Sequence, residues 1–403
     1  MRGKQALVDF ARHKPDLAGS RMDKVQTPII PVIAELIRAH PGTISLGQGV
    51  VHYGPPPLAI ERVRELDYAA DIHNYGPTGG IAPLCELIAA KLAVENGIRT
   101  DAGVSVIVTA GSNMAFLHAL FAITRAGDEV ILPVPYYFNH EMAIAMLDCR
   151  AVLVPTDDDY LLQPETIRRV ISPRTRAIVT VSPNNPSGMV YPEDSLREIN
   201  AICREHGLYH ISDEAYEYFT YNETRHFSPG SISGAGSHTI SLYSLSKAYG
   251  FAHWRIGYMA VPEHLVTALY KAQDTTLICP PVVSQYAATG ALEAGKSFFQ
   301  EKLGNIEDVR NIFLAELRKI NAYCTLSPSN GAFYFLLKLD TTLDDMTVVR
   351  RLISEHRVAV IPGHTFGLGN GCYLRVAYGA LDRHHAREGI RRLTNGLKAV
   401  VEY

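Results

Sequence analysis

The 403-residue sequence has no strong net charge and no long hydrophobic run, and each absence excludes a class of protein. Its 38 Lys and Arg nearly balance 41 Asp and Glu, a formal charge of −3, so no basic surface predicts nucleic-acid binding. No stretch approaches the roughly 18 apolar residues of a membrane-spanning helix, and the residues after Met1 contain no apolar signal-peptide core. We therefore expect a cytoplasmic protein that binds neither a membrane nor nucleic acid.

Cysteine is scarce and scattered along the chain. The closest two of the six, Cys279 and Cys324, are 45 positions apart, so the sequence contains no Cys-x-x-Cys pair of the kind that zinc sites use. His206 and His210 are four residues apart, but Gly207 lies between them and interrupts a helix. We predict buried thiols and no metal site.

Short runs rich in Val and Ile alternate with amphipathic segments through the middle of the chain. Runs of this length without strict alternation are typical of strands that are buried on both faces of a largely parallel sheet. The intervening segments, 113–124 and 193–205 among them, have helical spacing, so the pattern predicts an α/β fold with a doubly wound, mostly parallel sheet. The expected strands are 104–109, 129–134, 151–155, 176–181, 208–212, 239–243 and 255–261.

The pattern changes after residue 262, where helical segments dominate up to residue 321. An apolar stripe at three- and four-residue steps over 299–320 predicts a long packing helix. A smaller α+β unit follows, with expected strands at 332–337, 358–361 and 372–377 and a closing helix at 386–397. We divide the chain into an arm with part of the small domain (1–48), a large domain (49–295) and a small C-terminal α+β domain (296–403).

Lys247 ends the apolar, strand-like run Ser-Leu-Tyr-Ser-Leu-Ser-Lys. A lysine after a serine-rich turn is more often at the surface, but in a site of low dielectric it loses its proton and forms Schiff bases with carbonyl compounds. Arg255 follows eight residues later, and arginine is the preferred bidentate partner of phosphate; Ser244 adds a hydroxyl. A Schiff-base lysine beside a phosphate site indicates an aldehyde that carries a phosphate, which points to pyridoxal 5′-phosphate.

Three further motifs suit the same cofactor. Asp213 ends a buried strand, where it would pair with a pyridine nitrogen, and Tyr216 follows three residues later; capping of a following helix is the alternative role of Asp213. Asn185 lies in the turn Ser-Pro-Asn-Asn-Pro-Ser-Gly, for which plain turn chemistry is the alternative. Gly111 begins a strand-to-helix turn whose free N–H groups suit a phosphate.

Together these motifs resemble the class I/II pyridoxal-phosphate-dependent aminotransferases of fold type I, over nearly everything from Ser20 to the C-terminus. The resemblance implies that Lys247 forms the Schiff base and that Asp213 holds the pyridine nitrogen. It also makes the large domain the cofactor-binding one. The implied donors to the phenolic oxygen are Tyr216 and Asn185, and the implied phosphate site is Gly111, Ser112, Asn113, Ser244 and Arg255.

The resemblance assigns four more positions. Tyr137 falls where the family stacks an aromatic ring on the cofactor. Arg375, in Tyr-Leu-Arg-Val-Ala-Tyr-Gly, falls where the family binds the substrate α-carboxylate, with Gly49 and Asn185 beside it. Tyr75 resembles the tyrosine that reaches the cofactor phosphate of the neighbouring subunit, which implies a homodimer.

The implied activity is transfer of an amino group from an L-amino acid to a 2-oxo acid by a ping-pong mechanism. Residues 275–283 contain no Arg or Lys, so we expect a neutral or aromatic amino donor, with Arg21 as an unassigned cation. Two departures from the family, 50–53 and His253, affect the inference of substrate. An aspartate-specific aminotransferase is the alternative within the same reaction.

Three other functions remain to be compared. A pyridoxal-phosphate lyase or synthase on the same fold would use the same residues, because the cofactor does the electronics. An effector-binding domain of a transcription regulator would need a DNA-binding domain, for which the residues before Ser20 leave no room. A nicotinamide dehydrogenase would need Gly-x-Gly-x-x-Gly between a strand and a helix, and the glycine-rich run 367–371 precedes a strand.

Overall fold

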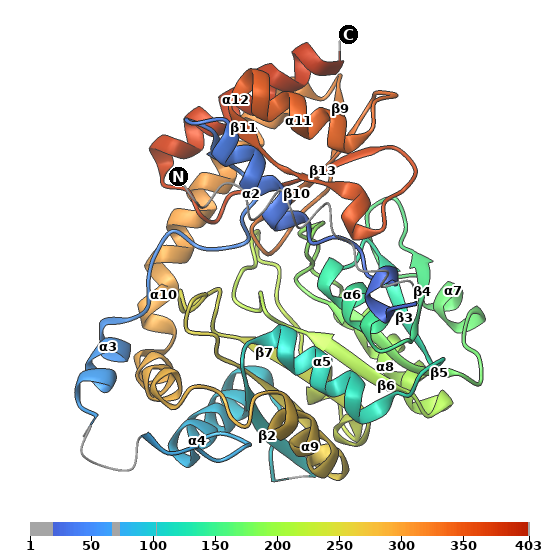
Figure 1. Cartoon of the computed structure of the whole chain (residues 1–403), viewed down its shortest axis with the longest axis vertical. Helices are drawn as coiled ribbons and strands as arrows, with labels where there is room; N and C mark the ends of the chain where they lie inside the picture. Colours follow the sequence, from blue (N-terminus) through green and yellow to red (C-terminus); the bar gives the residue numbers. More distant parts are fainter. Residues whose placement is uncertain (1–18, 67–72, 102, 402–403) are drawn as a thin grey trace.

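The computed structural model of the chain describes residues 19–66, 73–101 and 103–401. Residues 1–18 of the expected N-terminal arm lie outside the described residues. In Figure 1 a large sheet with its helices forms the lower part, and a smaller α+β layer lies above it. None of the described helices is both long enough and apolar enough to cross a membrane.

The lower part is built on a seven-stranded sheet in the order β2-β8-β7-β6-β5-β3-β4. The strands are β2 (Val104–Thr109), β3 (Glu129–Val134), β4 (Arg150–Pro155), β5 (Thr175–Val181), β6 (Tyr209–Asp213), β7 (Thr239–Ser244) and β8 (Gly257–Pro262). All strands run parallel except β8, which pairs antiparallel with both β2 and β7. All seven expected strands are present within about two residues of the expected bounds.

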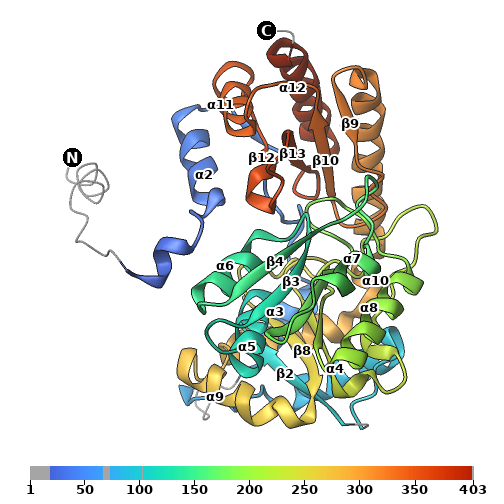
Figure 2. The same ribbon diagram turned by 90° about the vertical axis from the view of Figure 1, so that its right-hand side faces the viewer.

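Helices cover the faces of this sheet (Figure 2), which is why its strands read as continuous apolar runs. They are α4 (Ala82–Lys91), α5 (Ser112–Ile123), α6 (Phe138–Met146), α7 (Pro164–Arg169), α8 (Glu193–His206) and α9 (Val266–Thr276). On α8, Leu196, Ile199 and Cys203 are buried at helical spacing. The helix ends at Gly207, whose φ of 65° is the left-handed conformation that glycine adopts without strain.

The upper part contains a four-stranded sheet in the order β12-β13-β10-β9. Its strands are β9 (Cys324–Leu326), β10 (Tyr334–Leu339), β12 (Ile361–Pro362) and β13 (Cys372–Ala377), flanked by α2 (Ile29–Ala39), α11 (Asp345–His356) and α12 (Arg383–Val401). The single strand expected at 358–361 is wrong. It consists of β11 (Val358–Ala359), which pairs with β1 (Ile44–Ser45), and of β12, which belongs to the larger sheet.

The helix α10 (Val282–Leu317) joins the two parts, as Figure 1 shows. It packs on α3 (Pro57–Arg64) and α4 below and on α12 above. Its helical geometry is interrupted at Gly295, where φ is 61° and ψ is −159°. The predicted stripe that begins at Phe299 is buried at Phe299, Ile306, Val309, Phe313 and Leu317.

Candidate active site

A cavity of about 120 Å³ lies where several strands of the large sheet end. One water needs roughly 10–15 Å³ of such space, so the cavity has room for a small molecule. Its lining includes nine of the residues singled out in the sequence: Ser112, Asn113, Tyr137, Asn185, Asp213, Tyr216, Ser244, Lys247 and Arg255. Val181, Ala215 and Ser246 complete it. The nine residues are scattered over more than a third of the chain, and the parallel topology brings them together.

Lys247 follows β7 by three residues and extends its amine into the cavity. Its Nζ donates a hydrogen bond of 2.7 Å to the carbonyl oxygen of Gly49. Burial, together with the positive charges of Arg375 and Arg255, lowers the pKa of Lys247 from 10.5 to about 8. A lysine with this pKa keeps part of its population as the neutral amine at neutral pH, which is the nucleophilic form.

Asp213 is the last residue of β6 and is buried. Its Oδ1 accepts a hydrogen bond from the backbone N–H of Ala215, and its Oδ2 lies 3.1 Å from Nε2 of His140. The residues after Asp213 form a turn and no helix, so helix capping does not account for its position. His140, buried on α6, is a site residue that the sequence analysis missed.

Tyr216 and Asn185 meet in the lining of the cavity. The Nδ2 of Asn185 lies 3.5 Å from the hydroxyl of Tyr216, and its Oδ1 accepts a hydrogen bond of 2.9 Å from Nη1 of Arg375. Burial raises the pKa of Tyr216 well above its ordinary value, so the hydroxyl keeps its proton and is able to donate. The hydroxyl of Tyr334 lies 2.7 Å from that of Tyr216.

The start of α5 forms another wall of the cavity. Gly111 precedes the helix with a φ of 82°, and no side chain caps the first N–H groups, which leaves them free for a ligand. The φ of Gly111 favours glycine, and a Cβ there would displace the guanidinium of Arg255 from its present position. Arg255 itself is exposed at the rim and donates to the carbonyl oxygens of Ala110 and Ala252.

Arg375 lies on β13 in the upper sheet and is fully buried. Its guanidinium lies between the rings of Tyr334 and Phe366, at 4.7 and 5.1 Å from their centroids, and Nη2 donates to the carbonyl oxygen of Gly47. Its Nε is buried without a hydrogen-bond partner among the described residues. This arginine therefore retains donor capacity for a ligand.

Two of the predicted residues have less direct places. Tyr75 is 81% exposed and does not line the cavity of its own chain. Tyr137 does line it, and its hydroxyl accepts a hydrogen bond of 2.9 Å from Nδ2 of Asn139. Burial raises the pKa of Tyr137.

The departures from the family pattern also have definite positions. Tyr53 donates to the carbonyl oxygen of Ala248, next to Lys247, so the segment 50–53 supports the lysine loop. His253 is exposed and does not line the cavity. Arg21 lies 3.6 Å from Asp148 on the surface, outside the cavity lining.

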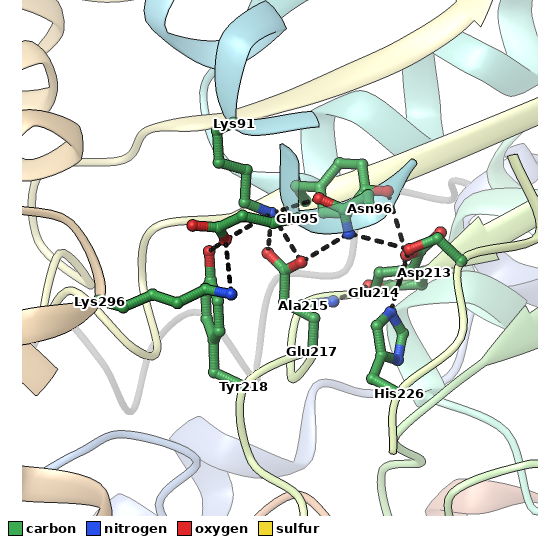
Figure 3. Close-up of polar contacts among 12 residues, drawn as sticks. Lys91, Glu95, Asn96, Asp213, Glu214, Ala215, Glu217, Tyr218, His226 and Lys296 are labelled. Atoms are coloured by element: carbon green, nitrogen blue, oxygen red, sulfur yellow. Dashed lines mark hydrogen bonds and ion pairs between the residues drawn. The ribbon is translucent and has the colours of Figure 1, made fainter. Parts of the chain in front are cut away.

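The turn that carries Asp213 and Tyr216 is anchored by a buried polar cluster (Figure 3). Glu214 accepts a hydrogen bond from Ser228 and contacts His226 at 2.9 Å. Glu217 forms an ion pair with Lys91 at 2.6 Å, in which both side chains are at most 10% exposed. Glu214 and Glu217 thus hold the turn from one side while Asp213, Ala215 and Tyr216 line the cavity on the other, which restricts the conformations of the turn.

Comparison with known proteins gives a consistent result. The family described as aminotransferase class I and II matches residues 41–393. The aromatic aminotransferase ISS1 of Arabidopsis thaliana is 35% identical over 93% of this chain and 95% of its own, and an aspartate aminotransferase of Pyrococcus abyssi is 32% identical over 89% and 92%. The crystal structure of an aromatic aminotransferase from Pyrococcus horikoshii superposes with a TM-score of 0.84 at 32% identity, covering 91% of this chain and 99% of that one.

Proposed function

Because the chain belongs to the class I and II aminotransferases, it transfers an amino group between an amino acid and an oxo acid, and we propose that it does so with pyridoxal phosphate in the cavity around Lys247. The observation that carries the proposal is the buried amine of Lys247, whose pKa is lowered to about 8 and which shares one cavity with Asp213 and Arg255. The family is pyridoxal-phosphate-dependent, and the residues of this chain suit that group.

Three features of the cavity support the fit. The uncapped N-terminus of α5 lies beside Arg255, and this arrangement suits a phosphate. Gly111, which has no side chain, lets the guanidinium of Arg255 approach the start of the helix. The carboxylate of Asp213 is buried and lines the same cavity, where it would pair with a protonated ring nitrogen. Two polar groups, the hydroxyl of Tyr216 and the amide of Asn185, remain to bind the ring oxygen.

The proposed roles follow from these positions. When bound, pyridoxal phosphate supplies an electron sink for the charge that develops at the substrate Cα. Lys247 would hold the group, and its amine in the neutral form would accept the proton from the substrate Cα. Asp213 would keep the ring nitrogen protonated, and His140, which contacts the carboxylate of Asp213, would orient it. Tyr137, which lines the cavity, would pack against the ring. The amino donor and the oxo-acid acceptor would react in turn at the same site, which gives ping-pong kinetics.

Arg375 is the proposed partner of the substrate α-carboxylate. Its guanidinium is held by Asn185, by the carbonyl oxygen of Gly47 and by two aromatic rings, so it is oriented before substrate arrives. The unpartnered Nε indicates that the arginine has a donor to spare. Arg375 donates to the carbonyl oxygen of Gly47, and that of Gly49, two residues later, accepts from Lys247, so this segment links the proposed substrate side of the site to the lysine.

A homodimer is part of the proposal. The exposed Tyr75 and the exposed Arg255 would be covered by a second copy, whose Tyr75 would reach the phosphate. We also propose the division at residues 48 and 295, and the interruption of α10 at Gly295 supports the second boundary. The cytoplasmic location stays a prediction from the sequence.

The proposed amino donor is neutral or aromatic. A distal carboxylate in a buried pocket costs several kcal/mol without a cation, and no Arg or Lys lies in residues 275–283. Arg375 is committed to the α-carboxylate, and Arg21 is engaged with Asp148. The named relatives include both aromatic and aspartate aminotransferases, so the choice between donors rests on charge.

The test is kcat/KM for phenylalanine and for aspartate with 2-oxoglutarate as acceptor. We expect aspartate to be slower by roughly 100- to 1,000-fold, since one unpaired carboxylate costs a few kcal/mol. Aspartate faster by tenfold or more would contradict the proposal, and loss of that activity in Arg21→Ala would then assign the second cation to Arg21. Ammonia release without a new amino acid would instead indicate a lyase.

A separate experiment tests the cofactor residue. The protein purified with pyridoxal phosphate is reduced with borohydride, digested and analysed by mass spectrometry. We expect the cofactor mass on the peptide that contains Lys247 and its absence in Lys247→Ala. The exposed Lys271 on α9 provides the control, because Lys271→Ala should leave the modified peptide unchanged. Modification of any other lysine would overturn the assignment.

A further inference from the structure

Tyr334 lies at the junction of the two sheets and contacts several of the proposed active-site groups. It is the first residue of β10 and is fully buried. Its ring is 4.7 Å from the guanidinium of Arg375, and its hydroxyl is 2.7 Å from the hydroxyl of Tyr216. A Cβ at Gly49 would overlap the same hydroxyl, so the glycine leaves room for it.

The number of hydroxyl protons decides which of Tyr216 and Tyr334 donates in the hydrogen bond between them. Each tyrosine hydroxyl has one proton, and burial raises the pKa of both, that of Tyr334 to about 12, so both stay protonated at neutral pH. The amide Nδ2 of Asn185 is only a donor. If Tyr216 donated to Tyr334, it would have no proton left for a ligand in the cavity. If Tyr334 donates to Tyr216, the proton of Tyr216 is free to point into the cavity.

We propose that Tyr334 is a positioning residue, whose O–H donates to the oxygen of Tyr216 and thereby directs the single proton of Tyr216 to the ring oxygen of the bound cofactor. The inference rests on the proposed function. Tyr334 lies on β10 of the upper sheet and does not line the cavity, so it would act on the cofactor through Tyr216. The inference therefore extends the site to the upper sheet. A donated hydrogen bond polarises the acceptor hydroxyl, which makes Tyr216 a stronger donor.

The test is a titration of the absorbance of bound pyridoxal phosphate against pH in wild type, Tyr334→Phe, Tyr216→Phe and the double variant. A donor to the ring oxygen stabilises its negative charge and weakens its hold on the proton of the neighbouring nitrogen. Loss of the donor should therefore move the titration midpoint to higher pH. For Tyr334→Phe we expect a shift of roughly 0.3 to 1 pH unit, the effect of one hydrogen bond, and a larger shift for Tyr216→Phe.

The double variant separates action through Tyr216 from an independent effect. If Tyr334 acts through Tyr216, the double variant should have the midpoint of Tyr216→Phe alone. Tyr221→Phe is the matched control, because Tyr221 is also a buried tyrosine. Its hydroxyl donates to the backbone oxygen of Ala332 and not to Tyr216. It should leave the midpoint unchanged. Tyr334→Leu also lacks the hydroxyl and replaces Tyr334→Phe if that variant does not fold.

The outcomes distinguish this inference from the proposed function. A normal titration in wild type with an unchanged midpoint in Tyr334→Phe would overturn the inference alone, as would additive shifts in the double variant. Wild-type protein that shows no absorbance of bound cofactor would overturn the proposed function and this inference together. Because Tyr334→Phe keeps the ring on Arg375, we expect KM for the amino donor to stay within about twofold while kcat falls.

Discussion

Replacement of Lys247 by methionine should stabilise the cofactor-free protein at neutral pH and lose that advantage in alkali. The pKa of Lys247 is lowered to about 8 in the folded chain, whereas an unfolded lysine titrates near 10.5. Between these pH values the unfolded state binds more protons than the folded state, so the stability of the wild type rises with pH. The cost of the buried charge is fully present below pH 8 and disappears as the pH approaches 10.5. Methionine carries no such cost.

The size of the effect follows from the shift. About 1.36 kcal/mol corresponds to one pKa unit, so a shift from 10.5 to about 8 is worth about 3 kcal/mol in full. The amine still borders the cavity, where water screens part of the charge. We therefore expect the difference in unfolding free energy between Lys247→Met and wild type to shrink by about 2 kcal/mol from pH 7 to pH 10.

Urea denaturation of the cofactor-free proteins at four pH values measures this difference directly. Lys271→Met is the control, since that lysine is exposed and its replacement should give a difference independent of pH. Parallel curves for Lys247→Met and wild type would show that the amine titrates as in the unfolded chain. The reasoning about a lowered pKa, and with it the nucleophilic state of Lys247, would then be wrong.

Three more changes have defined outcomes. Asp213→Ala should retain the cofactor in equilibrium dialysis but transaminate at least about 100-fold more slowly, and near-normal turnover would contradict its pairing with the ring nitrogen. Gly111→Ala should weaken cofactor binding at least about tenfold, because the added Cβ overlaps Arg255 and the φ of 82° disfavours alanine; unchanged affinity would show that the two groups separate without cost. Lys91→Met should lower the unfolding free energy by about 3 to 5 kcal/mol, since it leaves Glu217 buried without its cation, and a loss below about 1 kcal/mol in urea denaturation would refute this.

The strands of the large sheet could be predicted because each is buried on both faces and its apolar run is bounded by turns. The antiparallel direction of β8 could not, since a fully buried run such as Gly257–Pro262 has the same pattern in either direction. β1, β11 and β12 have two residues each, which is too short for any periodicity. The single strand expected at 358–361 was therefore wrong, because the segment forms two short strands in two different sheets.

The candidate site shows a similar division. Asp213 and Lys247 lie at or after the end of an apolar run and Arg255 precedes one, and such positions are visible in a sequence because polar residues bound a buried strand. His140 and Tyr334 were missed because each gains its meaning only from a partner distant along the chain, Asp213 in one case and Tyr216 in the other. Burial of a histidine on a helix and of a tyrosine in a strand resembles ordinary packing until the fold supplies that partner.

The antiparallel direction of β8 has a consequence for dividing the chain into fragments. Ser244 at the end of β7 pairs with Gly257 at the start of β8. Residues 245–256 therefore connect the two strands at the same end of the sheet. Lys247 and Arg255 thus belong to a single hairpin connection, and the proposed cofactor contacts of one chain, apart from Tyr75, lie between residues 111 and 255. A cut after Pro262 would leave them on one polypeptide and transfer Arg375 to the other. Complementation of two such fragments would separate capture of the cofactor from recognition of the substrate carboxylate.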